Sequence, residues 1–176
     1  MAARIVSIPL VLVSVLACGP SPTRPTPPGL PPLSPTNTLG QYTLTMTASP
    51  SCSLSPAVMS RVYEATVFER RAGLVEVAVD TEYPTACWGC LETGFQGTRD
   101  GDALQFDIVG EGGRWYFADL VQDGELRYDG TATATMLDNK SITGTFDGRI
   151  TILGGASFSP LAVCEATDHK MELVLQ

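Results

Sequence analysis

From Gly40 to Gln176 the chain alternates apolar and polar residues with a period of two. The clearest run is YTLTMTA, in which every second residue from Tyr42 to Ala48 is apolar and the residues between them are threonines. Such alternation predicts antiparallel strands with one buried face, and turn signals about every 8 to 12 residues separate the strands. The pattern therefore predicts an all-β domain of about eight or nine strands.

Several of these strands are predicted to pair as hairpins. GFQGTRDGDALQFDIV turns at Asp100-Gly101, and ELRYDGTATATMLDNKSITGTFDGRITIL turns at Asp138-Asn139-Lys140. Hairpin after hairpin favours an up-and-down meander, which removes its exposed edges when it closes on itself. We expect a closed or nearly closed barrel in which the last strand, HKMELVLQ, pairs with the first. A two-sheet β-sandwich is the alternative.

Two other segments complete the predicted elements. RWYFADLV is expected to form one strand after the glycines of GEGG. SLSPAVMSR is the only helix candidate, with Ser55 at the N-cap and Pro56 at the first helical position. The helix is expected to have one or two turns.

The first 39 residues have a different composition. Arg4 precedes an apolar run from Ile5 to Ala17, which is shorter than the roughly 20 residues of a transmembrane helix and is typical of a signal peptide. Eight prolines follow between Gly19 and Leu39. This composition favours an extended polyproline segment and cannot pack a core. The expected organisation is a signal peptide at 1–17, a proline-rich tether at 18–39 and a β-barrel domain at 40–176.

The apolar run ends in VLAC, from Val15 to Cys18. This motif resembles the lipobox of bacterial lipoproteins, in which the cysteine is lipidated and becomes the mature amino terminus. The resemblance implies that Cys18 anchors the protein to a membrane of the cell envelope, because two or more acyl chains give stable attachment. In a diderm bacterium it implies the outer membrane, since Gly19 stands where an aspartate usually causes retention in the inner membrane. An ordinary cleaved signal peptide is the alternative.

Two motifs frame the predicted domain, YTLTMTASPSC near its start and CEATDHKMEL at its end. They are similar to those of a set of uncharacterised bacterial lipoproteins that combine such ends with a β-rich middle. That similarity implies no activity. The expected order of hairpins also resembles avidin-like and lipocalin-like barrels, which is a likeness of architecture and does not define a function.

Charge and motifs exclude several function classes. All 19 acidic residues and nine of the 11 basic residues lie from Gly40 onward, so the domain has a net charge of −10. Nucleic-acid binding is not expected, because it needs clustered Lys and Arg. The sequence has no phosphate-binding loop, dinucleotide fingerprint or serine-nucleophile elbow, and no catalytic residue is assigned. The acidic stretches RDGDALQFD and QDGELRYDG lack the spacing of a calcium loop and are interpreted as turns.

Four cysteines remain if Cys18 carries lipid: Cys52, Cys87, Cys90 and Cys164. In an oxidising compartment they predict two disulfides, with three possible pairings. CWGC is not followed by the helix that a redox motif needs, and a disulfide within it requires a tight turn. We therefore pair Cys87 with Cys90, and Cys52 with Cys164.

A zinc site is the alternative use of these residues. It would take Cys87, Cys90, Cys164 and His169 as ligands and would leave Cys52 without a role. The favoured interpretation of His169 is a structural histidine, hydrogen-bonded near the end of a strand. No metal or other cofactor is expected.

The two long central strands carry many small residues on their inward face. The candidates for lining a ligand cavity are Tyr128, Ala132, Ala134, Phe146 and Trp115. Small inward residues leave a cavity in a ligand-carrying barrel. Alternatively, they allow the sheet to curl, and side chains from the opposite wall fill the space beside them. Two function classes follow: a binding module for a small apolar or partly polar ligand, and a structural or protein-interaction lipoprotein with a filled core. An enzyme is the least favoured class, and the oligomeric state cannot be predicted.

Overall fold

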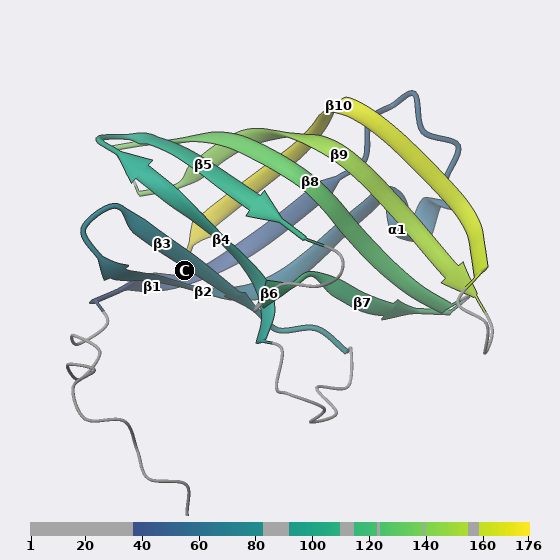
Figure 1. The fold of residues 1–176 in the computed structure, drawn as a ribbon, viewed down its shortest axis with the longest axis horizontal. Helices are drawn as coiled ribbons and strands as arrows, with labels where there is room; N and C mark the ends of the chain where they lie inside the picture. Colours follow the sequence, from purple (N-terminus) through teal and green to yellow (C-terminus); the bar gives the residue numbers. More distant parts are fainter. Residues whose placement is uncertain (1–36, 83–91, 110–114, 123, 139, 155–158) are drawn as a thin grey trace, which may run out of the picture. The chain divides into compact units, whose positions relative to one another are not determined.

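The computed structural model describes residues 37–82, 92–109, 115–122, 124–138, 140–154 and 159–176 (Figure 1). Ten strands and one short helix are found in this part of the chain. In chain order they are β1 (Asn37–Thr47), α1 (Pro56–Met59), β2 (Ser60–Arg71), β3 (Leu74–Val79), β4 (Glu92–Asp100), β5 (Ala103–Ile108), β6 (Trp115–Tyr116), β7 (Ala118–Val121), β8 (Gly124–Met136), β9 (Ile142–Gly154) and β10 (Ser159–Leu175). No helix among these residues has the length and apolarity that a membrane crossing requires.

Eight of the strands form a closed antiparallel barrel (Figure 1). Around its wall the order is β1-β2-β3-β4-β5-β8-β9-β10, so strands that follow one another in the chain lie side by side. The barrel closes where β10 pairs with β1, from Leu175 opposite Tyr42 to Lys170 opposite Thr47. The predicted all-β meander is therefore confirmed, and so is the pairing of the last strand with the first. The structure is a barrel and not the alternative sandwich.

The alternation in the sequence determines which face of each strand is buried. In β1 the side chains of Tyr42, Leu44 and Met46 are buried, while the threonines between them are partly exposed. The β4–β5 hairpin reverses between Asp100 and Ala103, one residue after the predicted position, and the β8–β9 hairpin reverses between Met136 and Ile142, as predicted. The short helix α1 also forms as expected, with Ser55 at the N-cap position and Pro56 in its first turn.

The segment RWYFADLV differs from its prediction, because it is broken at Phe117 into β6 and β7. The physical reason lies in the unequal lengths of the neighbouring strands. β5 ends opposite Gly130, but β8 begins six residues earlier, at Gly124, and needs another partner there. β7 pairs with this first part of β8, and β6 pairs with the first residues of β4. Together β6 and β7 occupy the place in the wall that β5 leaves.

The two ends of the barrel are built differently. At one end the strands are joined by the short turns after β2, β4 and β8. At the other end, which we call the loop end, β1, β3, β5 and β9 finish, and the connections are longer in sequence. α1, β6 and β7 belong to the loop end. The long strands β8, β9 and β10 extend toward it past the end of β5 (Figure 1).

Aromatic rings occupy the interior in one continuous run of contacts. The centroids lie 5.2 Å apart for Phe106 and Phe95, 5.6 Å for Phe95 and Phe117, 4.5 Å for Phe117 and Tyr128, 6.4 Å for Tyr128 and Phe146, and 5.2 Å for Phe146 and His169. Small residues make room for these rings. A Cβ atom on Gly148 would lie 2.6 Å from the ring of Phe146, and one on Gly130 would lie 2.8 Å from it. At these positions the space beside the small residues is filled by Phe146.

Candidate functional site

The predicted cavity residues fall into two places. Tyr128, Ala132 and Ala134 of β8 and Phe146 of β9 are buried on the inward face, and Ala132 lies directly opposite Phe146. Trp115 is also buried, but it belongs to β6, which pairs with β4. The structure therefore brings the first four residues together within the run of rings. Only Tyr128 among them also contacts the polar groups described next.

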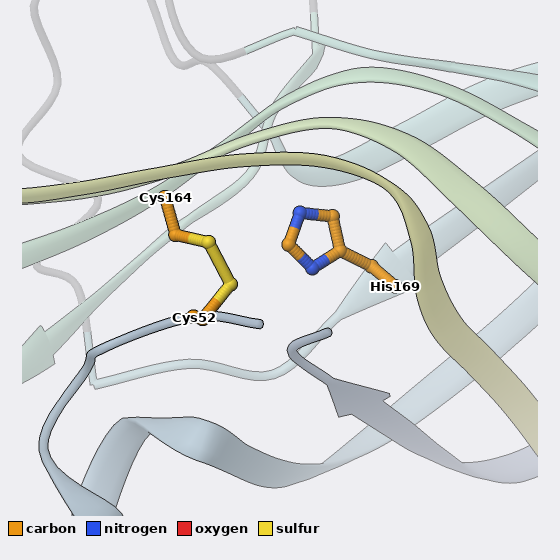
Figure 2. A group of neighbouring side chains, drawn as sticks. All are labelled: Cys52, Cys164 and His169. Atoms are coloured by element: carbon orange, nitrogen blue, oxygen red, sulfur yellow. A yellow bond between two sulfur atoms is a disulfide. The ribbon is translucent and has the colours of Figure 1, made fainter. Parts of the chain in front are cut away.

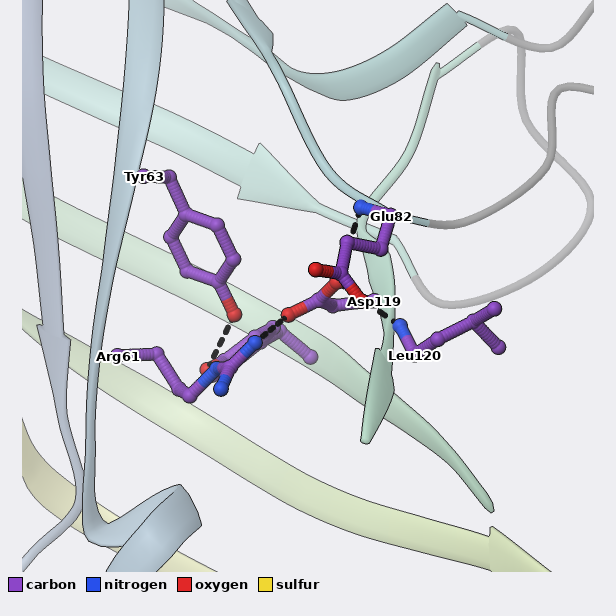
Figure 3. Close-up of polar contacts among 6 residues, drawn as sticks. Arg61, Tyr63, Glu82, Asp119 and Leu120 are labelled. Atoms are coloured by element: carbon purple, nitrogen blue, oxygen red, sulfur yellow. Dashed lines mark hydrogen bonds and ion pairs between the residues drawn. The ribbon is translucent and has the colours of Figure 1, made fainter. Parts of the chain in front are cut away.

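A charged pair lies inside the loop end of the barrel (Figure 3). Arg61 is on β2 and shares its inward row with Tyr63, Ala65 and Val67, so the strand alternation directs a guanidinium into the interior. Its Nη2 atom bonds to Oδ2 of Asp119, which comes from β7. The Asp119 side chain is only 1% exposed, and that of Arg61 is 29% exposed. A buried pair of this kind is favourable only if its remaining polar atoms are also satisfied.

Asp119 satisfies its second oxygen through the backbone. Oδ1 accepts hydrogen bonds from the N–H groups of Glu82, at 3.2 Å, and of Leu120, at 2.8 Å (Figure 3). The carboxylate thus connects β7 both to β2 and to the chain just after β3. On the side of Arg61, one donor is left over. Its Nε atom is buried and has no hydrogen-bond partner among the described residues.

Two tyrosine hydroxyls lie beside the charged pair. Oη of Tyr63 is 3.2 Å from Oη of Tyr128, and the Arg61 guanidinium lies 5.8 Å from the centre of the Tyr63 ring. Burial raises the pKa of Tyr63 to about 12 and raises the pKa of Tyr128 well above its ordinary value. Burial acts to lower the pKa of Arg61, but its bonds to Asp119 and Tyr63 more than offset this, and the pKa is raised. At neutral pH both phenols of the cluster are therefore neutral, and the guanidinium of Arg61 is a cation.

The segment Trp115–Val121, which we call the strap, is held by a second buried carboxylate. Glu125 of β8 accepts hydrogen bonds from the Tyr116 hydroxyl and from Nε of Arg127. Phe117 lies between Tyr116 and Asp119 and is held by its backbone. Its N–H bonds to the Val109 carbonyl, and its carbonyl accepts from the backbone N–H of Tyr128. The ring of Phe117 is fully buried and contacts Tyr63, Phe95 and Tyr128. The strap thus closes the wall and inserts a ring into the interior.

A disulfide joins Cys52 to Cys164, the pair favoured from the sequence (Figure 2). Their Cα atoms are 5.5 Å apart, within the usual range for a disulfide. The bond lies just beyond the seam between β1 and β10, whose pairing ends at Thr47 and Lys170. It therefore attaches the chain after β1 to the part of β10 that β1 does not reach. Cys18, Cys87 and Cys90 lie outside the described residues.

His169 lies beside the disulfide (Figure 2) and is fully buried. Both of its ring nitrogens form hydrogen bonds with the backbone. Nδ1 accepts from the N–H of Ser49 at 2.9 Å, and Nε2 donates to the carbonyl of Gly148 at 3.2 Å. Burial lowers the pKa of His169, although the Gly148 carbonyl and two nearby aspartates act in the opposite direction. This geometry is that of the structural histidine predicted from the sequence. A β-bulge between Ala166 and His169 brings the ring to this position.

The ligand atoms of Cys52, Cys164 and His169 lie within 4.8 Å of one another, as a metal site would require. However, the two sulfur atoms are bonded together and the imidazole is engaged on both sides. Of the zinc site considered from the sequence, Cys164 and His169 can be placed, and neither has a free ligand atom here. The two motifs that frame the domain, around Cys52 and around Cys164, meet at this point.

Sequence reasoning did not single out Arg61 or Asp119. The sequence pattern could have identified Arg61, because the alternation of RVYEATV places the arginine on the same face as Tyr63, Ala65 and Val67. The pattern could not have identified Asp119, because the break at Phe117 changes the register of the strand. No protein-family model, curated protein or solved structure matches the chain. Its function is therefore inferred from the polar cluster of Arg61, Asp119, Tyr63 and Tyr128 at the loop end.

Proposed function

We propose that this protein is a lipid-anchored lipoprotein of the cell envelope whose barrel binds a small, partly polar ligand at the loop end. The observation that carries the proposal is the buried cluster of Arg61, Asp119, Tyr63 and Tyr128 in an otherwise aromatic interior. Ligand sites typically combine apolar walls with a few convergent polar groups. The lipobox at Val15–Cys18 and the proline-rich tether support the anchoring.

A purely structural barrel has little reason to bury this pair. Removing a guanidinium and a carboxylate from water is costly, and apolar residues of similar size often stabilise a protein equally well. Perturbed and buried titratable groups are concentrated at functional sites. The buried Nε donor of Arg61 has no hydrogen-bond partner among the described residues, which is destabilising. This favours a ligand that supplies the missing hydrogen-bond acceptor.

A second candidate is a structural or protein-interaction lipoprotein. It is favoured by the run of ring contacts from Phe106 to His169, which fills the middle of the barrel. With the interior occupied there, such a protein would act through its surface. For the same reason, the proposed ligand belongs at Arg61 and Tyr63 rather than among Ala132, Ala134 and Phe146.

Arg61→Gln tests the two candidates against each other. Full-length protein would be purified from the cell envelope of its source organism and analysed for bound small molecules by native mass spectrometry. The control is Arg149→Gln, because Arg149 also pairs with an aspartate, Asp129, but on the outer wall, where both side chains are about half exposed. We expect a small molecule that is lost in Arg61→Gln and kept in Arg149→Gln. Equal retention in both variants would show that the molecule binds away from Arg61. No bound molecule, together with co-isolated envelope proteins, would support the structural candidate instead.

A further inference from the structure

The strap has few backbone pairings for an element that closes a barrel wall. β6 has two residue pairs with β4, and β7 has four with β8. In contrast, β8 and β9 pair along almost their whole length, from Glu125 opposite Leu153 to Met136 opposite Ile142. Much of what holds the strap is therefore in its side chains: Tyr116 on Glu125, Asp119 on Arg61, and the ring of Phe117 against Tyr128. An element held in this way can be replaced by a molecule that makes the same side-chain contacts.

Phe117 and Asp119 together present a defined chemical group to the interior. The ring of Phe117 stacks on Tyr128, with centroids 4.5 Å apart and an interplanar angle of 27°. Two residues along the chain, the carboxylate of Asp119 bonds to Arg61. The barrel thus holds an aromatic ring and a carboxylate, both supplied by its own strap.

The guanidinium limits what could replace them. If Asp119 leaves, Arg61 becomes a partly buried cation without a counter-ion, which is strongly unfavourable. A replacement therefore has to be anionic. The flat faces of Tyr128 and Phe95 favour an aromatic ring next to that charge.

The carboxylate of a free ligand could also accept more hydrogen bonds from Arg61 than Asp119 does. Asp119 offers one oxygen to Nη2, because its other oxygen is used by the N–H groups of Glu82 and Leu120. The Nε atom of Arg61 stays buried without a partner among the described residues. A ligand carboxylate without those backbone bonds can accept from Nη2 and Nε together, the two-bond geometry that guanidinium favours.

We propose that the strap occupies the binding site as a built-in substitute, and that the ligand is an arylalkyl carboxylate that displaces Phe117 and Asp119. The ligand carboxylate binds Arg61 and its ring takes the place of Phe117 against Tyr128. This proposal rests on the proposed function and specifies the chemical class of its ligand. It also makes the strap a competitor whose contacts set the apparent affinity, since a site that is only partly open binds more weakly.

The test uses 3-phenylpropanoate as the probe and the neutral 3-phenylpropanol as its control, each titrated into full-length protein in detergent by calorimetry. Asp119→Asn weakens the hold of the strap and keeps its shape. We expect this variant to bind 3-phenylpropanoate at least tenfold more tightly than the wild type, with little gain for the alcohol. Asp129→Asn, the matched change in the exposed pair with Arg149, should leave the affinity unchanged. Arg61→Gln should abolish carboxylate binding.

Displacement of the strap has its own readout. In a Trp88→Phe background, Trp115 is the remaining tryptophan of the two in the chain, and it is buried in the strap. Binding should shift its fluorescence to longer wavelength as the strap leaves. The proposal is overturned if Asp119→Asn gains less than threefold for the carboxylate, if the alcohol gains as much, or if binding leaves the fluorescence of Trp115 unchanged. If the native protein still carries an Arg61-dependent molecule, only the ligand class and the displacement are wrong, and the proposed function stands.

Discussion

Replacing Cys52 and Cys164 together by serine should lower the stability of the barrel strongly. The disulfide closes a loop with a sequence separation of 112 residues. In the chain-entropy model, removing such a cross-link frees about 16 cal/mol/K in the unfolded chain, or about 4.8 kcal/mol at 25 °C. In the folded barrel no β1–β10 pairing replaces this cross-link, because β1 ends at Thr47 and does not reach the Cys164 region of β10.

The expected shift in melting temperature follows from the size of the domain. About 140 residues at about 2.1 cal/mol/K each give an unfolding entropy of about 0.3 kcal/mol/K. A loss of about 4.8 kcal/mol then lowers the midpoint by about 16 °C. Thermal unfolding followed by circular dichroism measures this shift, and unchanged near-ultraviolet spectra at low temperature would show that the variant still folds.

Cys87→Ser with Cys90→Ser is the matched control. The predicted bond in CWGC closes a loop of only four residues, so its removal should cost less than about 2 kcal/mol. The reasoning is refuted if the Cys52 and Cys164 double variant loses less than about 4 °C, or no more than the control loses. Non-reducing peptide mapping gives a second check, since it should recover Cys52 linked to Cys164.

Three further results are expected. Cys18→Ala should abolish membrane fractionation and detergent partitioning, and a variant that still sediments with membranes would place the anchor elsewhere. Because the folded pKa of His169 is lowered, its stabilising contribution should be present above the unfolded value of about 6.5 and be lost as the pH falls below it, by up to about 1.4 kcal/mol per pH unit. Chemical denaturation between pH 7 and 5 measures this slope, which should be smaller in His169→Gln; an equal slope would show that other groups cause it. Gly148→Ala should destabilise by about 1–3 kcal/mol, since the new Cβ would lie 2.4 Å from the Asp129 carbonyl oxygen, and wild-type stability would mean that the wall can yield there.

The barrel could be predicted because its information is local. Period-two alternation determines the buried face of each strand, and turn residues such as Asp100-Gly101 determine where each hairpin reverses. Closure then follows from the need to remove the free edges of β1 and β10. The pairing of Cys52 with Cys164 was predictable for the same reason, because Cys52 follows β1 and Cys164 belongs to β10, and closure brings these two strands together.

The polar cluster could not be predicted in the same way, because it depends on where strands end. Asp119 faces Arg61 only because β5 stops opposite Gly130 and β7 takes its place beside β8. Relative strand lengths are set by packing around the whole barrel, and the residues of RWYFADLV carry no signal of the break at Phe117. The length of β10 was missed for a related reason. It begins at Ser159, well before HKMELVLQ, and two bulges interrupt the alternation that would have revealed it.

The seam between β1 and β10 also has a consequence for how the protein acquires its fold. Tyr42 and Leu175 are neighbours in the closed wall but lie roughly 130 residues apart in the chain. Contacts of such high sequence separation form slowly, because the chain loses much of its freedom before they are made. Until Ser159–Leu175 arrives, β1 and β9 each present an open row of backbone donors and acceptors to any other unfinished chain. Loss of the last strand should therefore lead to aggregation rather than to a smaller barrel, because the open edges of β1 and β9 remain exposed until the barrel closes.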